Sequence, residues 1–386
     1  MPESARHAAA VSRSVREKWL VFVVAALLSA CTGASPSSPT SPAPPESSPE
    51  QNAQPGEGFP PQPEGVPFPA ESWPEGEWPA GVDRDVVHAA VDLAFADGGE
   101  PRVRAVVIVH GGEVVYERYS PNPLDGPTKV MPGFSMAKSF TSAFVGILVG
   151  QGRLDVDEPA PVPAWSREGD PRGAITLDDL LRMSSGLEWV EGPEVNDSDM
   201  VAAVVSGDAA AYAADKEQAH DPGTRFLYSG GNTVLLDRIL ADEVGSEQPF
   251  RPFMDTELFD KLGIDPMLLE FDGAGTWLGA YAADTTARNY AKFGLLYLRD
   301  GVWDGERILP EGWVEYSRTP SDTNPEYGAG WWLDLERPGV FYAVGVDGQV
   351  ITVAPEHDLT YVTLATDGPV SLPVSEAILD AFAGRE

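Results

Sequence analysis

The chain has 386 residues, of which 42% are apolar, enough to bury the core of one large domain or of two modest ones. Its 60 acidic and 26 basic side chains give a net charge of −34. Because nucleic acids and anionic membrane surfaces require basic patches, this balance argues against both as binding partners, and it identifies no substrate.

The N-terminus has the pattern of a bacterial export signal. Within residues 1–30, basic side chains precede the apolar run WLVFVVAALL, which is short for a membrane-spanning helix. The run ends in LSAC at 28–31, which resembles a lipobox, and Cys31 is the only cysteine of the chain. We therefore expect residues 1–30 to be a lipoprotein signal peptide and the exported protein to be anchored in the cell membrane through a lipid on Cys31. An ordinary signal peptide with an incidental cysteine is the alternative.

Residues 31–80 are rich in Pro, Ser, Gly and Glu. Few of them can bury apolar surface, and proline opposes both helix and central strand. The composition predicts a disordered or polyproline-like linker that lifts the folded domain away from the membrane. The domain itself is expected at 81–386, and with no cysteine left for a disulfide its stability must come from packing.

The folded part shows helical and strand patterns in a mixed order. Apolar spacing predicts a helix at 84–97, and two strand-like runs around the HGG sequence at 110–112 predict a β-hairpin. Further helices are expected at 135–150, 176–186, within 190–225, and at 233–245, 286–301 and 374–383. The stretch 341–367 alternates like two antiparallel strands joined by a Pro-Glu-His-Asp turn. This order predicts an α/β protein of the α+β type, in which terminal helices pack on an antiparallel sheet and a helical subdomain is inserted.

The sequence SMAK places Ser135 three residues before Lys138 at the start of an expected helix. Such a pair is weak evidence by itself, but residues three apart share one helix face, which brings hydroxyl and amine within reach. Unpaired N–H groups in the first helical turn favour a developing negative charge. The apolar helix body disfavours the charged form of Lys138, which could then act as a neutral amine base for Ser135.

A proton carrier for the leaving group is the second component that such chemistry needs. Tyr228 lies in the glycine-rich loop RFLYSGGN before an expected helix, and its phenol could carry a proton to the leaving group. A tyrosine considered alone is more often a core residue with a bonded hydroxyl. The residues themselves therefore leave both interpretations of Tyr228 open.

Several blocks in a fixed order resemble the serine beta-lactamase-related hydrolases. They are PGFSMAKSF, ITLDDLLRMSSGLEW, DPGTRFLYSGGN, YAKFGLLYLRDG, YGAGWWL and GVDGQVITVAPEHDL, and the resemblance covers most of 84–386. The nearest branch is the class C-like group of 6-aminohexanoate-dimer hydrolases and related esterases. The resemblance implies a beta-lactamase/transpeptidase-like fold and no metal or organic cofactor. It also implies Ser135 as the acylated nucleophile, Lys138 as its base and Tyr228 as the proton relay.

Two motifs depart from the pattern of this family. Its second motif carries an asparagine or serine where this chain has Gly230, so Asn232 is the possible substitute for orienting Lys138. Its Lys-Thr-Gly element is absent, and AVGVDG at 343–348 stands in its place. Because that lysine normally holds a substrate carboxylate, its loss argues against a beta-lactamase or D-amino-acid peptidase, which remain alternatives.

The substrate side of the site is expected around the end of this third element. Backbone N–H groups of Ser135 and of the strand near Gly345 and Val346 are the expected oxyanion hole. Asp347 would repel a substrate carboxylate and could hold an amine. Trp189 resembles a pocket-wall aromatic of the family, with a packing tryptophan of the helical subdomain as the equal alternative.

Three other functions are compatible with parts of the sequence. GFSMA at 133–137 approximates the elbow of α/β-hydrolases, with His357 as the candidate triad histidine, but the expected strands do not alternate with helices. The five histidines show no metal-ligand spacing. A non-catalytic surface lipoprotein that binds a cell-wall peptide or glycan is the third. We favour a serine hydrolase that cleaves a small ester, amide or peptide through an acyl-enzyme, and the sequence predicts no oligomeric state.

Overall fold

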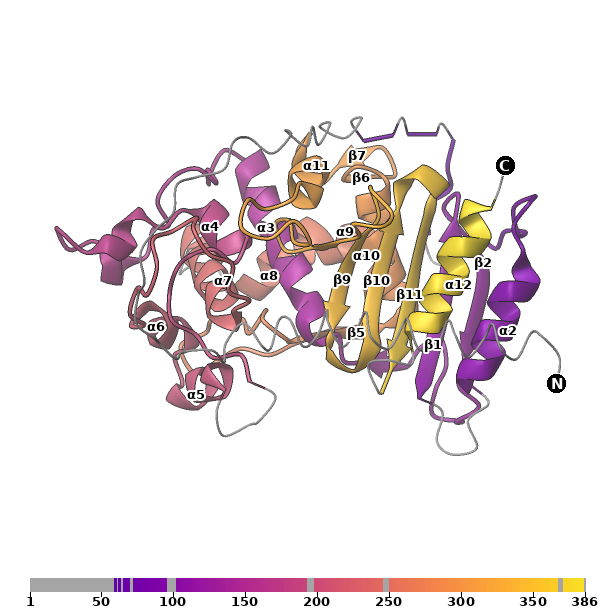
Figure 1. Ribbon diagram of the computed structural model, residues 1–386, viewed down its shortest axis with the longest axis horizontal. Helices are drawn as coiled ribbons and strands as arrows, with labels where there is room; N and C mark the ends of the chain where they lie inside the picture. The colour runs from indigo at the N-terminus through magenta and orange to yellow at the C-terminus, as the bar shows by residue number, and fades with distance from the viewer. Residues whose placement is uncertain are drawn as a thin grey trace, which may run out of the picture.

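The computed structural model describes most of the chain from residue 59 onward (Figure 1). The described residues are 59–60, 62–63, 65–69, 72–95, 102–192, 198–245, 250–366 and 371–384. The expected signal peptide, Cys31 and the first part of the expected linker therefore lie outside the described residues. Within the described ranges, no helix is long and apolar enough to cross a membrane.

A six-stranded antiparallel sheet forms the centre of the fold, with its strands in the order β2-β1-β11-β10-β9-β8 (Figure 1). In chain order these strands are β1 (Val103–His110), β2 (Glu113–Tyr119), β8 (Trp332–Leu333), β9 (Phe341–Gly345), β10 (Gln349–Ala354) and β11 (Leu359–Ala365). The N-terminal hairpin joins the C-terminal strands through the pairing of β1 with β11. The predicted antiparallel sheet and α+β class are thereby confirmed.

Helices cover both faces of this sheet. α2 (Arg84–Phe95) and α12 (Leu372–Ala383) pack together on one face (Figure 1), where they share an apolar cluster with β1 and β11. α10 (Ala287–Leu298) lies against the other face, and α3 (Ala137–Gly150) packs beside it near β9. Every residue of β10 and β11 is buried, as expected for strands covered from both sides.

The two turns that matter most for the sheet differ in how well the sequence predicts them. Gly111 and Gly112 have φ angles of 60° and 81°, which glycine adopts without strain, so HGG sets the hairpin as predicted. The stretch 341–367, by contrast, contains three strands instead of the expected two. A 3₁₀ turn with Asp347 at φ 63° separates β9 from β10. Aspartate tolerates this conformation, and the apolar alternation does not reveal the break.

The inserted segments form a helical region beside the sheet. Its elements are α4 (Leu177–Leu181), α5 (Asp199–Ser206), α6 (Ala209–Ala214), α7 (Gly230–Val244), α8 (Phe250–Met254), α9 (Asp260–Leu262) and α11 (Trp313–Arg318), with short strands β3 (Val130–Met131), β4 (Met267–Leu269), β5 (Ala283–Thr286), β6 (Val302–Trp303) and β7 (Glu306–Arg307). α4 begins at a capping box formed by Thr176 and Asp179. It ends before the expected residue 186, because Met183 leaves the helical conformation with φ 60°.

Residues just before 81 pack on the domain, in contrast to the free linker expected for 31–80. Trp73 is 7% exposed and belongs to the main apolar cluster. Gly76 N donates to Val114 O at 3.0 Å, beside the start of β2. The ring centroids of Phe68 and Trp303 are 5.0 Å apart. Aromatic side chains between the prolines supply apolar surface, which the high content of Pro, Ser, Gly and Glu in 31–80 did not indicate. The folded domain therefore extends further toward the N-terminus than residue 81.

Candidate active site

The residues around Ser135 form a tight turn that leads into α3. Ser135 lies in a 3₁₀ turn, Phe134–Met136, immediately before the α-helix, and Phe134 has an uncommon φ of 47°. Gly133 N donates to Asp284 Oδ1 at 3.1 Å. A Cβ added to Gly133 would lie 2.5 Å from the hydroxyl of Tyr290, so only glycine fits there. β5 and α10 thus hold the turn that presents Ser135, and backbone strain of this kind is often kept at functional sites.

Ser135 and Lys138 face each other at the start of α3. Lys138 Nζ lies 3.1 Å from Ser135 Oγ and also donates to the carbonyl oxygen of Ala280 at 2.7 Å. Lys138 is 4% exposed, whereas Ser135 is half-buried. The amine is therefore held within hydrogen-bond reach of a hydroxyl that solvent and small molecules can approach, the arrangement that activation of a nucleophile needs.

Tyr228 completes a group of three side chains from two distant segments. The Lys138 amine is 4.9 Å from the centre of the Tyr228 ring. Tyr228 precedes α7, whose start is capped by Ser229 Oγ accepting from Asn232 N at 3.3 Å. The cap fixes where the helix begins and so where the tyrosine projects.

Aromatic side chains beside Tyr228 were not expected from the sequence. The Tyr228 ring centre lies 5.6 Å from that of Trp332 and 6.1 Å from that of Tyr327, and Phe226 joins the same group. Trp332 and Phe226 are partly exposed, and Tyr327 is buried. YGAGWWL and RFLYSGGN carry these residues, yet neither sequence indicates that the two segments meet. The group places apolar surface on one side of the candidate site.

Asn232 and Trp189 bond to or pack against residues other than Lys138. Asn232 is 1% exposed, and its Oδ1 accepts a hydrogen bond from Ser185 Oγ at 2.8 Å. The Lys138 amine instead donates to the carbonyl oxygen of Ala280. Trp189 is 5% exposed, and a Cβ added to Gly231 would lie 2.6 Å from its ring, so it packs under α7. Its placement matches the packing alternative for this residue.

The end of β9 lies directly against the turn Phe134–Met136, which carries the candidate nucleophile Ser135. A Cβ added to Gly345 would lie 2.3 Å from Gly133 O and 3.2 Å from Phe134 Cβ, a contact that only glycine permits. Val346, which follows, is 60% exposed, and Asp347 is also exposed. The third expected element thus reaches the turn that carries Ser135, although it lacks the Lys-Thr-Gly sequence.

A buried acid that the sequence analysis missed lies behind Lys138. Asp237 on α7 is 0% exposed, and its carboxylate accepts hydrogen bonds from Thr141 Oγ1 at 2.8 Å and Gly279 N at 2.9 Å. Burial raises the pKa of Asp237 well above its usual range, while the nearby Lys138 charge acts in the opposite direction. The sequence signal is an aspartate on an otherwise apolar helix stretch, TVLLDRIL.

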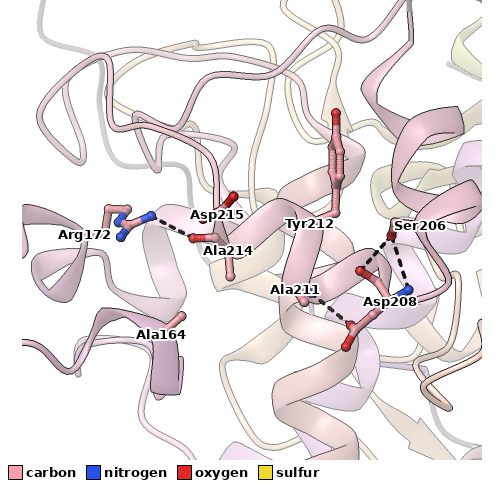
Figure 2. Close-up of a pocket in the computed structure, with 8 residues that line it drawn as sticks. All are labelled: Ala164, Arg172, Ser206, Asp208, Ala211, Tyr212, Ala214 and Asp215. Atoms are coloured by element: carbon pink, nitrogen blue, oxygen red, sulfur yellow. Dashed lines mark hydrogen bonds between the residues drawn. The ribbon is translucent and has the colours of Figure 1, made fainter.

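Figure 2 shows a hollow in the helical region that is lined by none of these side chains. Its lining residues are Ala164, Arg172, Ser206, Asp208, Ala211, Tyr212, Ala214 and Asp215. Arg172 donates to the carbonyl oxygen of Ala214, and Asp208 accepts from Ala211 N (Figure 2). Arg172 also donates to the carbonyl oxygen of Lys216. These bonds hold α6 in place, and we assign no function to the hollow. In the part of the chain that the structure describes, no group of three His, Cys, Asp or Glu side chains is placed to hold a metal ion.

The α/β-hydrolase alternative does not fit the sheet. His357 lies in the turn between β10 and β11, beyond Ala354 and so at the far end of β10 from Gln349, which pairs with Gly345. The strands around it are antiparallel, whereas the nucleophile elbow of that fold belongs to a mostly parallel sheet. The rival triad therefore has no geometric support.

Comparison with protein-family models matches residues 94–384 to the family described as Beta-lactamase. The chain belongs to the beta-lactamase family. Over 286 residues it is 27% identical to 6-aminohexanoate-dimer hydrolase of Paenarthrobacter ureafaciens, which covers 68% of this chain and 72% of that protein. Both the predicted family and its class C-like branch, with the 6-aminohexanoate-dimer hydrolases, agree with these matches.

Solved structures place the fold of this beta-lactamase family member in the same group. A Bacillus anthracis protein that carries the provisional name 6-aminohexanoate-dimer hydrolase matches with a TM-score of 0.68 and 20% identity, covering 82% of this chain and 89% of that one. EstCE1, described as a hydrolase with promiscuous acyltransferase activity, matches with a TM-score of 0.60 and 15% identity, covering 76% and 98%. At these identities the likeness establishes the beta-lactamase/transpeptidase-like fold, and members of the family are serine hydrolases.

Proposed function

We propose that this beta-lactamase-family protein hydrolyses an ester or amide bond through a covalent acyl-Ser135 intermediate. The observation that carries the proposal is the 3.1 Å contact between Ser135 Oγ and the buried amine of Lys138, with the Tyr228 ring 4.9 Å from the same amine. Nucleophile, base and proton relay are then the three groups that acyl transfer requires. No organic cofactor or metal takes part in the proposed reaction.

In the proposed reaction, neutral Lys138 takes the hydroxyl proton while Ser135 Oγ bonds to the substrate carbonyl carbon. The resulting oxyanion is stabilised by backbone N–H groups, for which Ser135 and Val346 are the candidates on the two sides of the Gly133–Gly345 contact. As the carbon–leaving-group bond breaks, Tyr228 passes a proton to the departing oxygen or nitrogen and is reprotonated from Lys138. Water then attacks the acyl-enzyme by the reverse relay and releases the acid.

The charge around the site favours a substrate with an amine or no charge over one held by its carboxylate. The chain contains no Lys-Thr-Gly or Lys-Ser-Gly sequence, and exposed Asp347 follows the strand end that abuts the nucleophile turn. A carboxylate would be repelled there, whereas an ammonium group would be attracted. The 6-aminohexanoate-dimer hydrolase among the relatives adds support for a short linear amide. We therefore place beta-lactams and D-amino-acid peptides second.

The proposed location of the enzyme is the outer face of the cell membrane. This part of the proposal rests on the sequence LSAC at 28–31 after an apolar run, with Cys31 as the lipid attachment site. The test is to express a Cys31→Ser variant in cells fed a radiolabelled fatty acid. Loss of membrane association and no incorporation of the label would support the anchor. Unchanged membrane association of that variant would contradict it.

The direct test is acylation by a fluorophosphonate probe and turnover of short p-nitrophenyl esters by the wild-type chain and Ser135→Ala. Labelling and turnover that disappear with Ser135→Ala support the enzyme. A wild-type chain that neither labels nor turns over any ester or linear amide would favour the non-catalytic binder of cell-wall peptide or glycan. A panel of paired amides with and without a terminal amine then measures the preference for charge.

A further inference from the structure

The fold supports the Lys138 amine through a connection that no motif reveals. Nζ donates to the carbonyl oxygen of Ala280, a residue distant in sequence from the lysine. The preceding residue, Gly279, donates its backbone N–H to Asp237 Oδ2 at 2.9 Å. The carboxyl group of Asp237 is thus one peptide unit away from the acceptor that fixes the amine.

The space around this connection is filled so closely that the segment has little freedom. Asp237 is 0% exposed and Thr141 is 1% exposed. A Cβ added to Gly279 would lie 2.6 Å from both Asp237 Oδ2 and Thr141 Oγ1, so the backbone here sits directly on the carboxyl group. Thr141 is three residues after Lys138 on α3 and shares its helix face. The carboxyl group therefore ties α3, α7 and the Gly279–Ala280 segment together.

The place where this family carries its asparagine is occupied differently in this chain. A Cβ added to Gly230 would lie 2.9 Å from Met200 Sδ and 3.4 Å from the Cβ of Ala280. A longer side chain at 230 would therefore compete with Met200 and with the segment that holds Lys138. Asn232, the substitute considered from the sequence, bonds to Ser185. The orienting group for the amine has to come from elsewhere.

We infer that Asp237 is a positioning residue, which holds the Gly279–Ala280 segment so that the Ala280 carbonyl keeps Lys138 aimed at Ser135. This inference rests on the proposed function of Lys138 as the base. Asp237 touches no substrate atom in this role and acts through the amine alone. Positioning matters because a displacement of about 1 Å in a reacting group can cost about a hundredfold in rate.

Burial of Asp237 favours the neutral form of its carboxyl group. Burial raises its pKa well above the usual range. The hydrogen bonds from Thr141 and Gly279 and the charge of Lys138 act in the opposite direction. If the carboxyl group is protonated, one oxygen still accepts from Gly279 N. The Thr141 hydroxyl, which donates to an ionised Asp237, then turns to accept from the carboxyl O–H. An asparagine reproduces both bonds, which makes it the conservative replacement.

The test compares Asp237→Leu with Asp237→Asn in the full chain, using a p-nitrophenyl ester and counting competent sites by fluorophosphonate labelling. Asp237→Leu removes the acceptor for Gly279 N, and we expect kcat per labelled site to fall by about a hundredfold with KM within about twofold. Asp237→Asn should restore most of the loss. Wild-type kcat in the leucine variant, or an asparagine variant as slow as the leucine variant, would overturn the inference.

A matched control separates positioning from loss of stability. Asp179 on the neighbouring helix α4 is also buried, at 8% exposure, and bonds to Thr176 in the capping box. Asp179→Asn is expected to lower the melting temperature while kcat per labelled site stays at the wild-type value. If Asp237→Leu behaves in the same way as this control, Asp237 has only a structural role.

Hydrogen exchange at the Gly279 amide tests the inference without reference to activity. We expect slow exchange in the wild-type chain and in Asp237→Asn, and exchange at least about tenfold faster in Asp237→Leu, because the buried acceptor is lost. Equal exchange in all three would reject the inference. A wild-type chain that is never acylated at Ser135 would instead reject the proposed function, and the exchange result would still decide whether Asp237 holds this segment.

Discussion

Helices α3 and α10 pack against each other, and each carries one buried lysine. The rings of Phe140 and Phe293 stack between them with centroids 3.7 Å apart. Lys138 on α3 is 4% exposed and Lys292 on α10 is 7% exposed. Lys292 donates to the carbonyl oxygen of Gly263, where α9 ends. Lys138 has the hydroxyl of Ser135 within 3.1 Å.

The two lysines show that burial alone does not make a base. Burial lowers the pKa of Lys292, yet no hydroxyl nucleophile is bonded to its amine in the described residues, and it serves as a helix cap. Lys138 is distinguished by what surrounds its amine: Ser135, the Tyr228 ring and the Ala280 carbonyl. Function should therefore follow the partners of each amine.

The largest expected effect distinguishes the lysine of α3 from the lysine of α10. Lys138→Ala should reduce kcat/KM for a p-nitrophenyl ester by about a thousandfold or more, because the proton of Ser135 loses its acceptor. Lys292→Met should leave kcat/KM within about twofold of wild type, since Lys292 is bonded to a backbone carbonyl of α9. Steady-state kinetics on both variants provide the measurement, with circular dichroism to confirm folding. Comparable losses in the two would mean that the contact with Ser135 is not what matters.

Tyr228→Phe sharpens the comparison, because it keeps the ring beside Lys138 and removes only the hydroxyl. We expect a loss of about a hundredfold for an anilide or alkyl amide, whose leaving group needs a proton, and a much smaller loss for a p-nitrophenyl ester, whose leaving group does not. The ratio of kcat/KM for the two substrates is the measured quantity. An equal loss for both substrates would remove the proton-relay role and leave Tyr228 as a packing residue.

The sequence predicted the parts of the molecule that depend on local patterns. The HGG hairpin follows from the freedom of glycine, and the helix from 135 onward follows from its apolar residues. The proximity of Ser135 and Lys138 follows from helix geometry alone, since i and i+3 lie on one face. The order of several sequence blocks supplied the family, which no single block could have supplied.

What the sequence missed depends on contacts between distant segments. Ala280 reaches Lys138, and Asp237 reaches Gly279, only after α7 and the segment before β5 fold against α3, and neither residue belongs to a recognisable motif. Trp189 was ambiguous because its sequence does not reveal the ring contact under Gly231. The turn at Asp347 was hidden because a non-glycine residue adopts φ 63° within an alternating stretch.

A smaller effect is expected at Asp347, on the substrate side of the nucleophile turn. Asp347→Asn should raise KM about threefold for a short amide or ester with a terminal amine and leave KM unchanged for the matched neutral compound, because an exposed charge contributes at most about 1 kcal/mol. Paired kinetics at low ionic strength test this. Identical KM changes for both compounds would show that Asp347 does not recognise charge.

The smallest effect concerns the stability contributed by Lys292. Burial lowers the pKa of this lysine. Between that lowered value and about 10.4, the unfolded chain binds the proton more tightly than the folded chain, so stability rises with pH across this window. Lys292→Met removes the buried charge, and at pH 7 we expect it to be about 1 kcal/mol more stable than wild type, provided that Met fills the same space.

The gain in stability from Lys292→Met should shrink as the pH approaches 10. The wild-type amine is then neutral in the folded chain, and its burial no longer carries the cost of a charge. Urea unfolding of both chains at pH 7 and pH 9.5 measures the two differences. If Lys292→Met were less stable than wild type at pH 7, the bond from the amine to Gly263 O would outweigh the cost of burying its charge, and Lys292 would be a net stabilising cap.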